Sequence, residues 1–253
     1  MERTGAVESL ESELARAREL DTARLADAIE TVGFECTHCG ACCRAETGCG
    51  GAGDEDGDEA ESDDARSADA EREPHTATVF PEEVRELQAA AADAGERPYD
   101  WRDVARPMPY GLDDGPDGPT GETFEWALAI DDCGDCAFYE ERDGDGACTV
   151  HDDRPLVCRT YPFSVALGGT SRPQGEVVDG DGLVRAHECE GLGRDIDRED
   201  AEALAAALKA RAVRELSEAV DVREAYEPVA VEDEVVVHDS EGAKRGDGTP
   251  LGE

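Results

Sequence analysis

Four cysteines lie within eight residues near the start of the chain, in the run Cys36-Thr37-His38-Cys39-Gly40-Ala41-Cys42-Cys43. A Cys-x-x-Cys turn brings two thiolates to one metal, because the two intervening residues let the chain fold back. Gly40 follows the second cysteine, where a tight turn often needs a positive φ that glycine adopts at low cost. Cys42 and Cys43 are adjacent, and neighbouring side chains diverge in regular backbone geometry. We therefore expect this pair to serve two different metals, or two sides of one cluster.

The remaining ligands of such a site should come from the other cysteines of the chain, which has 10 in 253 residues. Counting outward from the first block gives eight candidate metal ligands: Cys36, Cys39, Cys42, Cys43, Cys136, Cys148, Cys158 and Cys189. Cys133 forms a Cys-x-x-Cys pair with Cys136, so it could serve as a spare or alternative ligand. Cys49 is not expected to bind.

The N-terminal residues contain no charged segment followed by an apolar one, and no apolar run reaches the roughly 18 residues of a membrane span. The sequence therefore predicts a cytoplasmic protein, where thiols stay reduced. In that compartment ten cysteines indicate metal binding more than disulfides. A disulfide between the neighbours Cys42 and Cys43 would also be strained.

The charge balance is strongly acidic, with 64 Asp and Glu against 24 Lys and Arg and a net charge of −40. The acidic residues are spread along the whole chain. This favours an acidic, halophilic protein from a high-salt cytoplasm, where the Debye length is about 3 Å at molar salt. The alternative is an acidic protein that binds basic partners. Binding to nucleic acid or to an anionic membrane is not expected, because the sequence has no basic patch to neutralise phosphates.

Apolar periodicity and capping residues predict four helical regions. The first covers residues 8–20 and continues to 32, with Asp21 as an internal cap, and the second runs from Pro81 to about Ala94. The third is a short helix that ends at Pro162. The fourth covers about 198–224 and is capped near Asp197. Asp152 or Asp153 is expected to cap the short helix. Cys158 would then lie near its N-terminus, where the helix dipole favours the thiolate.

Alternating or β-branched runs predict short strands. They are residues 76–80, 122–130, two hairpins turning at 142–146 and 179–182, and a last strand at 235–237, with a loose tail from Asp239. The first hairpin would bring Cys136 and Cys148 close together. Trp101 and Tyr110 are expected to plug the core beneath a loop.

These elements predict an α+β fold, with a small metal-organised core of short strands and helices between an N-terminal helix and a long C-terminal helix. The expected divisions are a helical segment 1–33, a cysteine-cluster metal-binding domain 34–196 with a disordered acidic insertion 47–73, a helix 197–227, and an acidic tail 228–253. The insertion contains almost no apolar residues, so it cannot bury a core.

Polar residues near the cysteines are candidates for supporting roles. His38, His151 and His187 each lie within two residues of a candidate ligand. Each could replace a thiolate or donate a hydrogen bond to one, although an ordinary polar loop residue is the simpler interpretation. His75 and His238 have no such neighbour. Arg154 and Arg159 would offset the net −2 charge of four thiolates on a divalent ion, or form surface ion pairs.

Four blocks of the sequence, taken in order, resemble a known family: Phe34-x-Cys36-x-x-Cys39-Gly40-x-Cys42-Cys43-Arg44, Cys136-x-Phe138, Cys148-x-Val150-His151, and Arg154-Pro155-x-x-Cys158-Arg159-x-Tyr161-Pro162-Phe163. The family is the YkgJ-like cysteine-cluster, or CxxCxxCC, family. The resemblance covers residues 34–44 and 136–163 closely and Cys189 more loosely, and Cys49 and Cys133 fall outside it. It implies zinc or iron chelation, and some members are called iron–sulfur oxidoreductases.

The sequence does not distinguish between zinc and iron–sulfur clusters as the bound metal. Eight thiolates could hold two tetrahedral zinc ions or iron–sulfur clusters, since both take four cysteines. The spacing is not the bacterial ferredoxin run. We expect an iron–sulfur cluster or iron, with zinc as the close alternative.

The expected function is therefore metal chelation by clustered cysteines. The alternatives are an iron–sulfur-dependent oxidoreductase, with Arg44, Arg159 and Tyr161 as candidate polar residues, or a protein-interaction module with structural zinc. The expected partner is a metal ion. The sequence contains no nucleotide-binding loop and no Ser-His-Asp spacing that we can identify, so it indicates a site but no substrate.

Overall fold

The computed structural model describes residues 9–45, 73–93, 97–116, 118–142, 145–167, 175–229 and 234–251. The acidic insertion expected at 47–73 lies outside these residues except for Glu73, and Cys49 lies outside them too. Within the described residues the chain is a mixture of helices and small sheets, which confirms the predicted α+β class. No helix in these ranges is long and apolar enough to cross a membrane.

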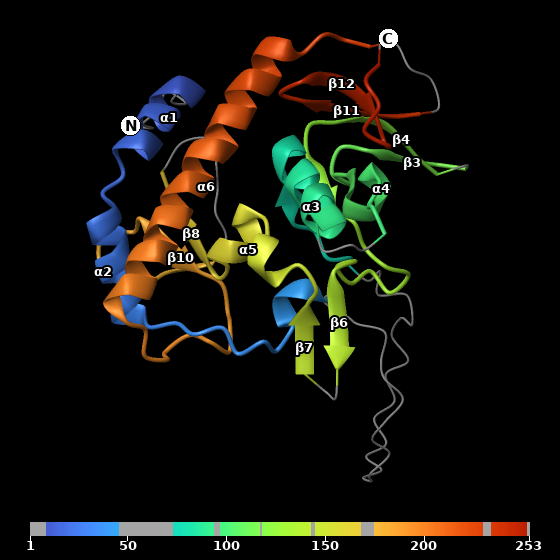
Figure 1. Cartoon of the computed structure of the whole chain (residues 1–253). Helices are drawn as coiled ribbons and strands as arrows, with labels where there is room; N and C mark the ends of the chain where they lie inside the picture. Colours follow the sequence, from blue (N-terminus) through green and yellow to red (C-terminus); the bar gives the residue numbers. More distant parts are fainter. Residues whose placement is uncertain are drawn as a thin grey trace, which may run out of the picture.

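Six α-helices and two 3₁₀ turns are present in the described residues (Figure 1): α1 Leu10–Glu19, α2 Thr22–Val32, η1 Ala41–Cys43, α3 Pro81–Asp93, α4 Trp101–Val104, η2 His151–Asp153, α5 Leu156–Thr160 and α6 Arg198–Ala225. Asp21 separates the first two helices as predicted, because its carboxylate accepts hydrogen bonds from Ala23 N and Arg24 N at the start of α2. Asp197 caps α6 in the same way through Asp200 N.

Helix α6 organises the first hydrophobic core. It crosses the molecule diagonally in Figure 1, with α1 and α2 along one side. Small and branched apolar residues repeat along its buried face: Ala201, Ala205, Leu208, Ala212 and Leu216. Its alanines let the neighbouring helices approach closely, and Leu25 and Ile29 of α2 are fully buried against this core.

The strands form four small sheets in the described residues. They have the orders β1-β5-β2, β8-β10-β9, β12-β11-β4-β3 and β6-β7. Their bounds are β1 Thr78–Val79, β2 Ala105–Pro107, β3 Asp113–Gly115, β4 Gly118–Thr123, β5 Trp126–Leu128, β6 Tyr139–Arg142, β7 Asp145–Cys148, β8 Phe163–Val165, β9 Glu176–Val177, β10 Val184–Ala186, β11 Val235–Asp239 and β12 Gly242–Arg245. A second core lies around β5 and α3, with Trp126, Leu128 and Leu87 buried in it.

The single strand predicted at 122–130 is wrong. The chain leaves one sheet at the end of β4 and enters another at β5, with Phe124 and Glu125 exposed between the two. All three residues of β5 are buried, so the strand is covered on both faces. The inward and outward alternation expected from the sequence therefore does not occur, because alternation requires one solvated face.

The loose tail predicted from Asp239 is also wrong. Strand β12 pairs antiparallel with β11, and β11 pairs in parallel with β4. The hairpin is held by Lys244, whose Nζ lies 2.7 Å from Asp239 and 2.6 Å from Glu241. Trp126 donates its indole N–H to the same Asp239 at 2.8 Å. The bond from Trp126 connects the end of the chain to the second core, and it joins residues 113 positions apart, too distant to be predicted from local composition.

Replacing Lys244 with alanine is expected to lower the free energy of unfolding by about 3–5 kcal/mol, because it leaves the buried carboxylate of Asp239 without its cation. Urea denaturation at a fixed salt concentration measures the loss. Arg97→Ala is the control, since it breaks an exposed pair with Asp103 that solvent screens, and its effect should be small. Equal midpoints for the two variants would contradict the prediction.

Candidate metal centre

All eight candidate ligands line one cavity of about 620 Å³. They come from five parts of the fold: the loop after α2 (Cys36, Cys39), η1 (Cys42, Cys43), the residues around β6 and β7 (Cys136, Cys148), α5 (Cys158) and the loop after β10 (Cys189). These eight are also the free cysteines of the described residues. Cys133 is disulfide-bonded, so it offers no thiolate and is not the spare ligand that its spacing suggested.

Backbone hydrogen bonds hold the first cysteine block in place. Glu35 N donates to Gly191 O at 3.1 Å, which brings the loop of Cys189 alongside. Cys43 N donates to Gly40 O, and Cys136 N donates to Cys43 O, both at 2.8 Å. The positive φ predicted for Gly40 is confirmed at 73°, and a β-carbon there would clash with the ring of Tyr139.

The thiols can be divided by exposure and position into two sets of four, and Cys42 acts on the pKa of thiols in both sets. We call Cys43, Cys136, Cys148 and Cys158 the inner set. Burial raises the pKa of Cys158, and the charges of Cys136, Cys42 and Cys148 raise it further. Burial also raises the pKa of Cys136 to about 11, again with contributions from Cys148 and Cys42. The inner set includes the one buried thiol among the eight, Cys136.

The outer set consists of Cys36, Cys39, Cys42 and Cys189. Burial raises the pKa of Cys189, and the charges of Cys39, Cys42 and Cys36 add to that rise. Cys36, Cys39 and Cys42 are exposed, in contrast to the inner thiols. The outer set therefore lies at the mouth of the cavity, where solvent and solutes reach it.

Cys42 and Cys43 lie where the two sets meet, with their Sγ atoms 3.8 Å apart. The hydrogen bond with Cys43 lowers the pKa of Cys42 to about 7. The same bond raises the pKa of Cys43, together with burial and the charges of Cys42, Cys136 and Cys158. This grouping agrees with the expectation that the adjacent pair serves two sides of a site, and its metal-binding role stays a prediction.

The local structure around Cys158 differs from the one predicted. Asp152 and Asp153 lie in η2 and do not cap α5. Glu83 of α3 takes that role, because its carboxylate accepts hydrogen bonds from Leu156 N at 2.7 Å and Phe80 N at 3.0 Å. The pKa of Cys158 is raised and not lowered, since burial and the neighbouring thiolates outweigh the dipole of a five-residue helix.

Arg154 is the cation with the clearest influence on the thiols. Its positive charge acts to lower the pKa of Cys42, Cys148 and Cys158. At Cys148 and Cys158 burial has the larger effect, so the pKa of each is raised. Its Nε donates to His151 O at 2.8 Å, which fixes the guanidinium beside the cavity. Arg44 and Arg159 also line the cavity. The predicted charge compensation therefore has a clear candidate in Arg154.

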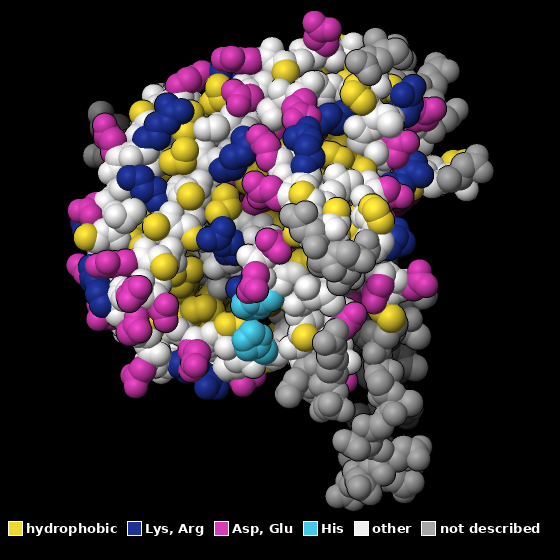
Figure 2. Space-filling model, in the orientation of Figure 1, with side chains coloured by type: hydrophobic (Ala, Val, Ile, Leu, Met, Phe, Trp, Pro, Cys, Tyr) yellow, Lys and Arg dark blue, Asp and Glu magenta, His cyan; other side chains and the backbone are white. Residues whose placement is uncertain are grey.

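The candidate histidines gather at this cavity, and one histidine that sequence reasoning set aside joins them. The ring centroids of His38 and His151 are 5.1 Å apart. Figure 2 shows histidine side chains lying side by side on the face of the molecule that it draws. His187 stacks on Tyr161, whose pKa is raised to about 12 by burial and by Cys189. His75 lines the cavity too, from a position with no cysteine nearby in sequence, so no local motif could have identified it.

The residues around the cavity fit a thiophilic metal. Eight thiols converge on it, and the buried Nε2 of His151 has no hydrogen-bond partner in the structure. Soft sulfur donors select zinc, copper(I) and iron–sulfur clusters. Among the described residues, no three His, Cys, Asp or Glu side chains form a group that could hold a metal ion in this conformation.

Comparison with known proteins adds one finding. No curated protein and no solved structure matches the chain. Residues 35–190, more than half of the chain, match the CxxCxxCC family, whose domain is described as a "putative zinc- or iron-chelating domain". The matched range contains all eight cysteines of the cavity. The chain therefore belongs to the CxxCxxCC family of metal-chelating domains.

Proposed function

We propose that the protein binds metal at two four-thiolate centres, one made by the inner set and one by the outer set. The observation that carries this proposal is that eight free cysteines line one cavity, with Cys36, Cys39 and Cys42 exposed and the others buried or half-buried. Four thiolates complete the coordination of a structural zinc ion, and they also ligate each common iron–sulfur cluster. The set of donors thus suits two complete centres.

We further propose that the metal is iron in iron–sulfur clusters. The cavity of about 620 Å³ supports this choice, because it has room for a polynuclear cluster beside the thiols that line it. A polynuclear cluster spans a wider set of thiolates, as its irons are held apart by bridging sulfide.

The two centres would differ in role because they differ in exposure. The inner set lies among residues of the second hydrophobic core, such as Phe138 and Val157, so its metal would hold β6, β7 and α5 together. The outer set is open to solvent at three of its four thiols, so its metal would exchange ligands or electrons with other molecules. Solvent exposure and nearby charge also tune the reduction potential of a cluster.

The test is elemental analysis with acid-labile sulfide determination and a visible absorption spectrum, on protein purified without oxygen. Iron and sulfide in a brown protein would support the proposal. A colourless protein with about two zinc ions per chain would retain the two centres but overturn the iron–sulfur assignment. A folded protein that takes up neither iron nor zinc would overturn the function itself.

A further inference from the structure

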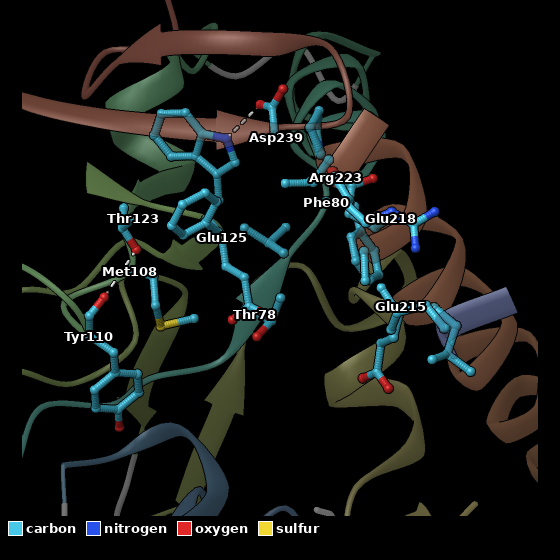
Figure 3. Close-up of a pocket in the computed structure, with 18 of the residues that line it drawn as sticks. Thr78, Phe80, Met108, Tyr110, Thr123, Glu125, Glu215, Glu218, Arg223 and Asp239 are labelled. Carbon is cyan, nitrogen blue, oxygen red and sulfur yellow. Dashed lines mark hydrogen bonds between the residues drawn. The ribbon is translucent and has the colours of Figure 1, made fainter. Parts of the chain in front are cut away.

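A second cavity, of about 790 Å³, lies between α6 and the strands β1, β4 and β5 (Figure 3). Its walls are mainly apolar. They include Val79, Val165, Leu167 and Leu216 from the two hydrophobic cores, together with Met108 and Val222. It shares Thr78 and Tyr110 with the cysteine cavity, so the two are neighbours. A cavity of this size with apolar walls is the usual form of a small-molecule site.

Exposed aromatic side chains concentrate at this cavity. The described residues include four large hydrophobic side chains that are strongly exposed, and three of them line it: Tyr110 at 70%, Phe124 at 47% and Tyr226 at 38%. Tyr110 was expected to plug the core, so its exposure corrects that prediction. The rings of Phe124 and Tyr226 are 5.7 Å apart and both pack on His238, which is buried. Exposed apolar groups gathered in one place mark a binding surface.

The charged groups of the cavity are mostly acidic. Four carboxylates and one guanidinium line it, and the guanidinium, Arg223, forms an ion pair with Glu11 at 2.5 Å. Two of the carboxylates on α6 have arginine partners, since Glu215 lies 2.7 Å from Arg211 and Glu218 lies 3.0 Å from Arg214. Glu218 is also buried, and its Oε1 accepts a hydrogen bond from Ser240 N at 2.9 Å. The cavity therefore has no free cation to receive an anionic ligand.

Glu125 is the carboxylate without a counter-charge. It follows β4 on the strand side of the cavity, opposite the glutamates of α6, and its side chain forms no hydrogen bond or ion pair with the described residues. The cavity opening leaves it accessible to solvent, yet the surrounding atoms and the charges of Glu215 and Glu218 raise its pKa. A cation placed beside Glu125 would relieve that repulsion.

We propose that this cavity binds an apolar organic amine in its protonated form. The ammonium group would lie between the Glu125 carboxylate and the faces of Phe124 and Tyr226, where cation–π attraction adds to the ion pair. The hydrocarbon part would extend along the apolar wall toward Leu216 and Val222. A ligand held there would lie beside the cysteine cavity, since Tyr110 borders both.

The test is calorimetric titration of the whole protein with three probes of equal chain length: octylamine, octanol and octanoate. Measurements at high salt screen unspecific attraction to the acidic surface. Octylamine is expected to bind one molecule per chain, at least about tenfold more tightly than octanol or octanoate, because a charge-assisted contact is the strong one. Glu125→Gln should remove that preference and weaken octylamine binding by about tenfold.

Glu86→Gln is the matched control, because Glu86 is exposed on α3 and does not line the cavity. It should leave octylamine binding unchanged. Ala219→Leu, which fills part of the apolar wall, should weaken all three probes alike. Circular dichroism verifies that each variant is folded. The proposal is overturned if octanoate binds as tightly as octylamine, if Glu125→Gln binds octylamine normally, or if Glu86→Gln weakens it equally.

Discussion

Cys136→Ser is expected to remove the inner metal centre and unfold the region around it, whereas Cys36→Ser removes the outer centre alone. Cys136 is buried at the meeting point of η1, β6 and α5, so its loss leaves three thiols and a polar hydroxyl in the second core. Structural metal sites contribute on the order of 10 kcal/mol to folding when the site forms only in the folded chain. Cys36 is exposed, and no core depends on it.

Metal content per chain and urea denaturation measure this difference. The metal content should fall by about half in Cys36→Ser with little change in the unfolding midpoint, since in the proposed arrangement each set supplies one four-thiolate centre. Cys133→Ser is the matched control, because this cysteine is disulfide-bonded and lies outside both sets, and it should keep the full metal content. Equal metal loss and equal destabilisation in Cys36→Ser and Cys136→Ser would contradict the division into an inner and an outer set.

Acidification is expected to release metal from the inner set steeply, by as much as about ten thousandfold in affinity per pH unit, because each of four thiols must lose a proton to bind. In the metal-free protein burial raises the pKa of Cys136 to about 11, and the pKa values of Cys148 and Cys158 are raised as well. These thiols are therefore neutral near pH 7, and the metal must displace their protons. Affinity then falls as the pH falls and levels off only above the raised pKa values.

Zinc titration of metal-free Cys36→Ser in a weak buffer with a pH indicator measures the protons released. About four protons per zinc are expected from the inner set. The outer set should release fewer protons per zinc. It is measured in Cys136→Ser if that variant folds, and otherwise as the difference between the unmutated protein and Cys36→Ser. Its Cys42 has a pKa of about 7 and is already partly ionised. Release of one proton or none by the inner set would show that its thiols are not the ligands.

Several local features were predictable because their cause lies within a few residues. Asp21 and Asp197 cap helices through their own side chains, and the positive φ of Gly40 follows from the tight turn between its neighbouring cysteines. The hairpin before Cys148 follows from the Gly and Asp residues at its turn. The α+β class could be predicted as well, since it depends only on which segments form helices and which form strands, and local sequence patterns indicate both.

Other features depend on contacts between distant parts of the chain. The C-terminal residues become part of a sheet because β11 pairs in parallel with β4 and Trp126 donates a hydrogen bond to Asp239, 113 positions away in sequence. Glu83 replaces the expected caps of α5 from another helix, 73 residues away in sequence. Tyr110 is an aromatic residue of the kind expected in a core. It is exposed because it lines a cavity, where no other side chain of the described residues covers its ring.

The sequence by itself predicted which residues bind metal, because thiols in short, tightly spaced motifs are typical of metal sites. The structure brings those eight cysteines to one cavity. Only the tertiary structure decided how they divide. The contrast between the exposed Cys36, Cys39 and Cys42 and the five less exposed thiols depends on where the loop of Cys189 and helix α5 pack against the first block. Burial and mutual charge are properties of that packing, so they cannot be read from spacing along the chain.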